Sequence, residues 1–361
     1  MVAAAVLTGC QGLPDLSGAS SAEVAQTLVD TRRVPGISFA VLMHGEVISS
    51  GAVGVADVET GEPVRRDTLF EGASLTKPVI AAIAMRLFEA GVFDLEEPVA
   101  QTVKAPRIRD RVTYASVTPR HLLAHTSGLP NWSGDPLDDG RRNVLKFKFQ
   151  PGQRFSYSGE GYGILQEFLE QKSGRSMEEL SRELFEELGM SRTTLVGASS
   201  PRRAARGHWG RSPSREARRI DHPIAALSLL TNAEDYVRLL RYEAGGSALS
   251  PETLAEFRKR QVTIERSDAT HNPYTLGWSL GWGVLERPDG AIYFQWGDNG
   301  PFRAFAAFSQ SSANGIVYFA NGSDGLLYVN EFARPALGDL SPAIAWFSRP
   351  ALEWARRIIR Y

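Results

Sequence analysis

The sequence contains a single cysteine, Cys10, among its 361 residues. One thiol excludes an internal disulfide framework and any zinc cluster built from cysteines. The chain also lacks an excess of charge of either sign, because 40 Lys and Arg nearly balance 41 Asp and Glu, giving a formal net charge of −1. A charge-driven nucleic-acid binder is therefore excluded. The sequence has no internal repeat, and no apolar run approaches the roughly 20 residues that span a bilayer.

The overall composition is that of a globular protein. Hydrophobic residues make up 43%, charged residues 22% and aromatic residues 9% of the chain. These proportions exclude disordered, collagen-like and coiled-coil proteins. At roughly 150 residues per domain, the length predicts two lobes or one large domain.

The N-terminus begins with a short apolar run, MVAAAVLTGCQG, which contains Cys10. Residues 7–10 (Leu-Thr-Gly-Cys) resemble the lipobox of bacterial lipoproteins, in which the cysteine is lipidated and the preceding residues are removed. The alternative is an ordinary start with an incidental cysteine, since the run is short and has no Lys or Arg before it. We expect residues 1–20 to be a lipoprotein-type signal remnant and tether, with the protein held outside the cytoplasm through the Cys10 lipid.

Apolar patterning and turn residues predict the order of the remaining elements. A helix at 21–33 precedes a hairpin of strands at 37–43 and 47–53, and a buried helix follows Ser74. The middle of the chain has an exposed loop at 198–218 and helices at 118–125, 160–173, 177–187 and 232–242. Antiparallel strands return at 278–285, 291–296, 303–309 and 315–321.

This order predicts an α+β fold in which both ends of the chain build one antiparallel sheet flanked by helices. The domain covers 21–337, with a sheet lobe formed by about 21–90 and 245–337. An inserted all-helical lobe covers about 91–244. A C-terminal helical tail, 338–361, is expected to dock on the protein body, although its basic amphipathic pattern is also typical of a helix lying on a membrane.

Ser74 and Lys77 form a Ser-x-x-Lys motif at the start of the buried helix, where a spacing of three residues puts both on one face. Ser74 is either an N-cap, a common position for serine, or a nucleophile. The N-cap interpretation is weakened by Lys77, because a cation in the first turn opposes the helix dipole. The dipole and burial both lower the pKa of this lysine, and a neutral lysine beside a serine hydroxyl can activate it as a nucleophile.

From here the sequence resembles the serine hydrolases of the penicillin-recognising fold, which include class C β-lactamases, D-alanyl-D-alanine carboxypeptidases, D-aminopeptidases and family VIII-like esterases. The resemblance runs over about 25–337. It rests on ordered matches at 71–78 (EGASLTKP), 121–129 (HLLAHTSGL), 151–162, 229–235, 274–283 and 296–300 (WGDNG). It implies a β-lactamase/transpeptidase-like fold and a covalent acyl-enzyme formed without a metal or cofactor.

The resemblance also implies residue roles. Ser74 is the nucleophile, Lys77 the base that activates it, and Tyr157 the group that carries protons to and from the leaving group. The alternative for Tyr157 is a core aromatic residue with a satisfied hydroxyl. Its Gly, Ser and Pro neighbours favour a loop at the edge of a site.

Two boxes of the family depart from their usual residues. Gly159 stands where Tyr-x-Asn has its amide. The third box normally begins with Lys or His, and we align it with Asp298, Asn299 and Gly300. A cation there meets a substrate carboxylate, whereas Asp298 would repel one. We therefore expect an ester, amide or peptide substrate that is neutral or cationic at that end, and disfavour a true β-lactamase or D-Ala-D-Ala carboxypeptidase.

The third box also contributes an N–H to the family's oxyanion hole, together with the N–H of the serine. If the donor followed Gly300 it would be Pro301, which has no N–H. Either Gly300 or Asn299 donates in a shifted register, or the hole is half built. The altered boxes keep a second class of function open, a non-catalytic binding or sensor protein on the same fold.

Two further motifs compete with this hypothesis. The segment 277–281 is a literal G-x-S-x-G around Ser279, but a strand follows it and no histidine comes later in the chain, so a nucleophile elbow is excluded. His121 and His125 have the spacing of a zinc-binding helix. No Glu lies between them, so we interpret them as a structural pair and expect no metal.

Overall fold

The computed structural model describes residues 15–348, apart from residues 17, 139–142, 198–203, 211, 247–248 and 268–272. In this part of the chain, eight strands form one antiparallel sheet in the order β2-β1-β12-β11-β10-β9-β8-β7. Their bounds are Gly36–Met43 (β1), Glu46–Gly54 (β2), Val262–Arg266 (β7), Thr275–Trp278 (β8), Gly283–Arg287 (β9), Gly290–Asp298 (β10), Arg303–Ser309 (β11) and Gly315–Ala320 (β12).

Both ends of the domain build this sheet, as the sequence predicts. The N-terminal hairpin β1–β2 adds to the C-terminal strands through β1, whose Ile37 is paired with Ala320 of β12. The segment predicted as one strand at 278–285 is instead the end of β8, a tight turn and the start of β9. In that turn the N–H and hydroxyl of Ser279 both donate to the Trp282 carbonyl, at 2.8 and 3.2 Å.

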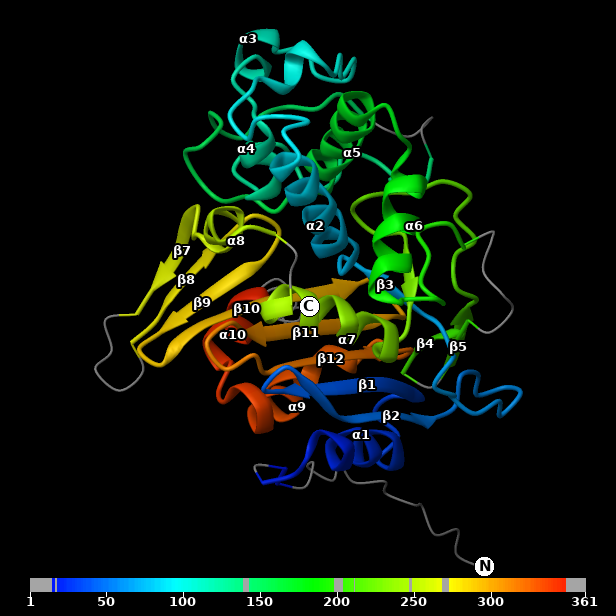
Figure 1. The fold of residues 1–361 in the computed structure, drawn as a ribbon. Helices are drawn as coiled ribbons and strands as arrows, with labels where there is room; N and C mark the ends of the chain where they lie inside the picture. Colours follow the sequence, from blue (N-terminus) through cyan, green and yellow to red (C-terminus); the bar gives the residue numbers. More distant parts are fainter. Residues whose placement is uncertain are drawn as a thin grey trace, which may run out of the picture.

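The two faces of the sheet are covered by helices from different parts of the chain (Figure 1). Helices α1 (Ser21–Asp30) and α9 (Val329–Leu337) pack on one face, and α2 (Thr76–Glu89) and α7 (Ala233–Arg241) on the other. Successive residues of β12 alternate between these two cores, since Ile316 and Tyr318 join the first and Val317 and Phe319 the second. This is the alternation expected of a strand buried on both faces.

The helical part stands above one end of the sheet in Figure 1, in cyan and green. It contains α3 (Arg111–Tyr114), α4 (Pro119–Leu123), α5 (Gly159–Ser173) and α6 (Met177–Leu188). Helix α7, expected at the end of the helical lobe, packs against the sheet instead. Its Ala233 N–H donates to Ser38 of β1, and the rings of Tyr236 and Phe319 meet at 5.8 Å.

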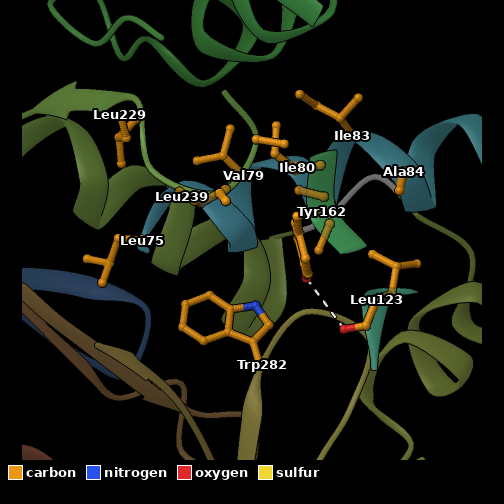
Figure 2. Close-up of a cluster of buried hydrophobic side chains, with 14 of the residues drawn as sticks. Leu75, Val79, Ile80, Ile83, Ala84, Leu123, Tyr162, Leu229, Leu239 and Trp282 are labelled. Carbon is orange, nitrogen blue, oxygen red and sulfur yellow. Dashed lines mark hydrogen bonds between the residues drawn. The ribbon is translucent and has the colours of Figure 1, made fainter. Parts of the chain in front are cut away.

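Helix α2 is buried along most of its length, because its first ten residues are apolar or small except for Lys77. Figure 2 shows Val79, Ile80 and Ile83 of this helix among side chains from other elements. One of these, Tyr162 of α5, donates its hydroxyl to the Leu123 carbonyl at 3.4 Å. Helix α2 thus joins the sheet to the helical part, and its N-terminus lies at their junction.

Short elements complete the junction. Strand β3 (Phe70–Ala73) leads into α2 and pairs with β6 (Leu229–Thr231), while β4 (Gly207–Trp209) and β5 (Ser212–Arg215) form a small hairpin. The hairpin belongs to the segment predicted as an exposed loop. Within its described residues, Ala205 and His208 are fully buried, and the His208 N–H donates to the Asn321 carbonyl at 2.9 Å.

Five elements remain among the described residues: the short helices η1 (Val99–Gln101), η4 (Tyr242–Gly246) and η5 (Gly325–Tyr328), and the helices α8 (Pro251–Arg258) and α10 (Ser341–Phe347). Helix α10 belongs to the predicted C-terminal tail and docks on the protein body. Its Phe347 stacks on Trp296 of β10 at 5.0 Å. Residues 349–361 lie outside the described residues, as do residues 1–14 of the expected signal remnant and tether at 1–20, including Cys10. In the described ranges, no helix combines the length and apolar character needed to cross a bilayer.

Candidate active site

Ser74 lies in the turn between β3 and α2, and its side chain is not used as a helix cap. The N-cap position of α2 is Leu75, and no side chain makes a capping hydrogen bond there. The residue before the serine, Ala73, has a φ of 49°, an uncommon conformation for a residue other than glycine. Ser74 is partly exposed between buried neighbours. Its hydroxyl is therefore held at a surface by a strained turn, which favours the nucleophile over the N-cap interpretation.

Lys77 is fully buried one turn further along, and its Nζ atom reaches the serine. Nζ lies 3.1 Å from Ser74 Oγ and donates to the Ala226 carbonyl at 2.8 Å. It also lies 4.8 Å from the centre of the Tyr157 ring. Burial without a carboxylate among these partners lowers the pKa of Lys77 to about 7. The sequence predicted both the contact with Ser74 and the direction of this shift.

Tyr157 is positioned by the start of α5. Ser158, the N-cap of that helix, accepts the Gly161 N–H, so the preceding tyrosine is fixed relative to the helix axis. The Tyr157 ring packs against His125 at 4.2 Å and Trp296 at 5.4 Å. Burial raises the pKa of the phenol, which stays protonated at neutral pH. The structure therefore brings together Ser74, Lys77 and Tyr157.

The third side chain at Ser74 is Gln295 of β10, which sequence reasoning missed. Its Nε2 atom donates to the Tyr157 hydroxyl at 2.6 Å and to the Ser74 carbonyl at 3.1 Å. Gln295 is fully buried. A neutral amide thus occupies the strand position that faces the serine and the tyrosine.

The predicted alignment of the third box at Asp298, Asn299 and Gly300 needs a correction by three residues. Side chains alternate along a strand, so Asp298 lies on the face opposite Gln295. Its carboxylate pairs with Arg303 of β11 at 2.5 Å and accepts the Gly300 N–H at 2.9 Å. These contacts belong to the β10–β11 turn, and they remove Asp298 as the group that would repel a substrate carboxylate.

Gly297 is the residue of β10 that approaches the serine turn. A Cβ atom added there would lie 2.3 Å from the Gly72 carbonyl oxygen and 3.2 Å from Ala73 Cβ. Only glycine permits this approach between β10 and β3. The third box is therefore Gln295-Trp296-Gly297. With this shift the residue that follows the box is Asp298, so Pro301 is no longer a candidate for the oxyanion donor.

Asn299 has a structural partner instead. Its Nδ2 atom donates to Glu71 at 2.8 Å, and its carbonyl accepts from Arg215 at 3.0 Å. Glu71 is buried in β3 and paired with Arg215. This cluster ties the β10–β11 turn to the strand that carries Ser74.

The second box departs from its usual residues because a side chain from another segment fills the space. A Cβ atom at Gly159 would lie 2.5 Å from the indole of Trp132. An asparagine at this position would collide with that ring. Trp132 lies far from Gly159 in the sequence and has no motif of its own, so nothing in the sequence indicated it.

A protein-family model with the description Beta-lactamase matches residues 22–334 of the chain. The chain belongs to the beta-lactamase family. Esterase EstB from Burkholderia gladioli is 29% identical over 312 residues, which cover 72% of this chain and 78% of the esterase. Penicillin-binding protein 4 from Amycolatopsis lactamdurans is 25% identical over 333 residues, which cover 85% of this chain and 86% of that protein.

Solved structures confirm the predicted β-lactamase/transpeptidase-like fold. The octameric penicillin-binding protein homologue from Pyrococcus abyssi superposes with a TM-score of 0.72 at 22% identity, covering 84% of this chain and 74% of its own. EstCE1, a hydrolase with promiscuous acyltransferase activity, superposes with a TM-score of 0.68 at 22% identity. The match covers 85% of this chain and 93% of EstCE1. Helix α10 lies beyond the residues that the family model matches.

The two histidines singled out in the sequence do not share a helix face. Helix α4 ends at Leu123, and His125 beyond it has a φ of 57°. His121 joins the capping box of α4 through Thr118. The Nδ1 atom of His125 accepts the Ser158 N–H at 3.1 Å, so the family's 121–129 segment supports the Tyr157 loop. Among the described residues no group of three or more His, Cys, Asp or Glu could hold a metal ion.

Ser279 of the G-x-S-x-G segment is fully buried, and its hydroxyl donates to the Trp282 carbonyl. A Cβ at Gly281 in the same turn would lie 2.3 Å from Ala81 of α2. The segment is a packed turn under α2 and does not present a nucleophile.

Proposed function

We propose that this member of the beta-lactamase family is a serine hydrolase that forms an acyl-enzyme on Ser74, with Lys77 as base and Tyr157 as proton carrier. One observation carries the proposal: a buried lysine with a pKa of about 7 lies 3.1 Å from the serine hydroxyl. A lysine that is largely neutral near pH 7 can accept the serine proton, and this is what a Ser–Lys nucleophile requires. No cofactor enters the mechanism.

In the acylation step, Ser74 Oγ adds to the acyl carbonyl while Lys77 Nζ takes the hydroxyl proton. Backbone N–H groups of Ser74 and of the Gly297–Asp298 region are the proposed donors to the oxyanion. Tyr157 then gives its proton to the leaving oxygen or nitrogen as the bond to the acyl carbon breaks. Lys77 returns the proton to Tyr157. The raised pKa of Tyr157 supports this role, because the phenol is available as a donor at neutral pH.

In the deacylation step, a water molecule adds to the acyl carbonyl and gives its proton to neutral Lys77. The bond between Ser74 Oγ and the acyl carbon breaks, and Oγ takes the proton back from Lys77 Nζ. The two steps together consume one water and release a carboxylic acid and an alcohol or amine.

We favour a small-molecule ester, amide or peptide without a carboxylate at the third box. Gln295 stands where a cation would bind that carboxylate, and an amide offers hydrogen bonds but no charge. Activity as a β-lactamase or D-Ala-D-Ala carboxypeptidase is the alternative, and the similarity to penicillin-binding protein 4 keeps it open. The similarity to Esterase EstB supports the ester.

A non-catalytic binding or sensor protein is the alternative from another class. It would keep the reactive serine but lack turnover, because Gly159 removes the second-box amide. Labelling of Ser74 without release of product would favour it.

The test is the intact mass after incubation with a fluorophosphonate, followed by turnover of p-nitrophenyl butyrate. We expect one label and turnover for the wild type and neither for Ser74→Ala. Ser279→Ala, which removes the serine of the G-x-S-x-G segment, is the matched control and should keep both. An unlabelled wild type would refute the catalytic proposal.

We further propose that Cys10 carries a lipid and that the catalytic domain acts outside the cytoplasm, tethered to the membrane. The lipobox-like segment 7–10 is the support. Expression of the full gene in a bacterium with radiolabelled palmitate should label the wild type and leave Cys10→Ser unlabelled. A soluble, unlabelled wild type in the cytoplasm would contradict the tether.

A further inference from the structure

His125 contacts three consecutive residues of the loop that carries the proposed proton carrier. Its carbonyl accepts the Ser156 N–H at 2.8 Å, and its Nδ1 atom accepts the Ser158 N–H at 3.1 Å. Between these two contacts its ring packs on the ring of Tyr157, with the ring centres 4.2 Å apart and the planes inclined by 34°. One residue thus holds the backbone on both sides of Tyr157 and the aromatic ring itself.

The contact with Ser158 fixes the protonation state of the imidazole. Because Nδ1 accepts an N–H it carries no proton, and in the neutral ring the proton lies on Nε2. His125 is fully buried, and burial together with the charge of Lys77 holds its pKa well below the usual value. The titratable rings packed against it are the phenols of Tyr157 and Tyr162, and burial raises the pKa of both. The imidazole is therefore a neutral acceptor at neutral pH.

The remaining features of His125 are unfavourable for a side chain that only fills space. In the described part of the chain its Nε2 atom is buried without a hydrogen-bond partner, which costs free energy. The residue also has a φ of 57° just beyond the end of α4, a position that glycine usually takes. What favours a histidine here is the pair of contacts made by Nδ1 and by the face of the ring.

Tyr157 needs this support because its hydroxyl must keep one direction toward the leaving group. A tyrosine side chain turns about two torsions, χ1 and χ2, and a small misplacement of a catalytic group lowers the rate strongly. Gln295 donates to the hydroxyl oxygen at 2.6 Å, so the phenol proton stays available for another acceptor. Trp296 packs on the ring at 5.4 Å. His125 alone among these neighbours also contacts the backbone next to the tyrosine.

We propose that His125 is the positioning residue of Tyr157: its neutral imidazole holds the 156–158 loop and fixes the direction in which the phenol delivers its proton. This inference rests on the proposed function. It assigns His125 no contact with the substrate, and it gives the buried histidine of the 121–129 segment a role in proton transfer to the leaving group.

This role predicts a dependence on the leaving group. p-Nitrophenolate leaves without being protonated, whereas the more basic phenolate gains from a proton delivered as the bond breaks. p-Nitrophenyl butyrate and phenyl butyrate form the same acyl-enzyme, so their kcat/KM values compare the acylation step alone. His125→Phe keeps a ring and removes the acceptor. We expect it to raise the ratio of kcat/KM for the p-nitrophenyl ester to that for the phenyl ester by about tenfold.

Three further variants separate positioning from a structural effect. Tyr157→Phe should raise the ratio at least as much, and adding His125→Phe to it should raise the ratio no further, because the histidine acts through the phenol. His125→Asn places an amide oxygen where Nδ1 accepts and tolerates the positive φ, so it should restore part of the ratio. His121→Asn, in the capping box of α4, is the matched control and should lower the melting temperature without changing the ratio.

A second measurement uses the wild type only. The nitrogen-15 NMR shifts of the His125 ring report its tautomer, and we expect the neutral Nε2–H form at pH 7. A proton on Nδ1 would overturn the proposal even if the variants failed to fold, because Nδ1 could not then accept the Ser158 N–H.

An unchanged ratio in His125→Phe, with kcat/KM intact or equally lowered for both esters, would also overturn the positioning role, as would a further rise in the double variant. Absence of both label and turnover in the wild type would instead refute the proposed function, and the role of His125 with it.

Discussion

At the scale of single residues, the site depends on how Lys77 is surrounded. The side chain is buried among Ser74, the Ala226 carbonyl and the rings of Tyr157 and Tyr162, all of them uncharged. Burial stabilises the neutral amine over the ammonium. The same environment lowers the pKa to about 7, as the proposed role of Lys77 as base requires.

We expect kcat/KM to rise with pH through about 7, because the proposed base is the neutral form of Lys77 and its fraction grows as pH increases. Lys77→Arg keeps the charge but cannot lose its proton at these pH values. Its activity should fall by about 10²- to 10⁴-fold. A pH profile of p-nitrophenyl butyrate hydrolysis measures both, and a flat profile between pH 5.5 and 8.5 would contradict the role of Lys77.

The corrected third box leads to a prediction that separates two positions three residues apart. Gln295→Lys puts a cation beside Tyr157 and should improve kcat/KM for p-nitrophenyl hemisuccinate relative to acetate by about tenfold, since one charge–charge contact is worth about 1–4 kcal/mol. Asp298→Lys should leave the ratio unchanged, because this side chain faces Arg303. The opposite outcome would restore the alignment expected from the sequence.

At the scale of elements, the close approach of β10 to β3 sets the geometry of the site. Gly297 allows the approach and Gln295, on the same face, uses it to reach Ser74 and Tyr157. The approach is backbone against backbone, so neither strand can yield by turning a side chain.

Gly297→Ala should therefore separate the two strands and lower activity by about 100-fold, with a loss of about 1–3 kcal/mol in the free energy of unfolding from overpacking. Kinetics and urea denaturation measure the two effects. Gly163→Ala is the matched control for stability, because open space surrounds this glycine in α5. The free energy of unfolding of Gly163→Ala should rise by about 0.5–1 kcal/mol, because alanine is favoured over glycine inside a helix. Full activity in Gly297→Ala would show that the approach is dispensable.

The elements also show what the sequence could and could not predict. Ser74, Lys77 and α2 were predictable because a local motif leads directly into a long apolar run. The register of β10 was not predictable, because the sequence Asp298-Asn299-Gly300 fits either a third box or a turn between two strands. Only the pairing of Trp296 with Phe305 and the contact of Gly297 with β3 fix which face points at the serine. Trp132 depends on a contact between distant segments, for which a single sequence carries no signal.

At the scale of the whole molecule, the C-terminal helix α10 packs against aromatic residues that contact Tyr157. Trp346 packs on Trp296 and Phe155, each at 5.6 Å, and Trp296 packs on Tyr157 at 5.4 Å. A chain of aromatic contacts thus connects a helix outside the family match to Tyr157, the proposed proton carrier.

Trp346→Ala should lower the free energy of unfolding by about 1–3 kcal/mol, less than for a fully buried tryptophan because this side chain is half-buried. We also expect a several-fold fall in kcat, since Trp296 loses a neighbour that fixes it against Tyr157. Thermal unfolding and ester turnover measure the two effects, with Trp209→Ala as the exposed control. An unchanged melting temperature would indicate that α10 contributes nothing to the fold.

The pairing of β1 with β12 has a consequence for how the protein is made. A ribosome adds about 5–20 residues per second, so β1 waits some tens of seconds before its partner strand exists. During this time one edge of the N-terminal hairpin has no neighbour, and an unpaired strand edge attracts other chains. A nascent chain stopped before residue 315 cannot complete the sheet. Chaperones that cover exposed strands should therefore bind such stalled chains and release the finished protein.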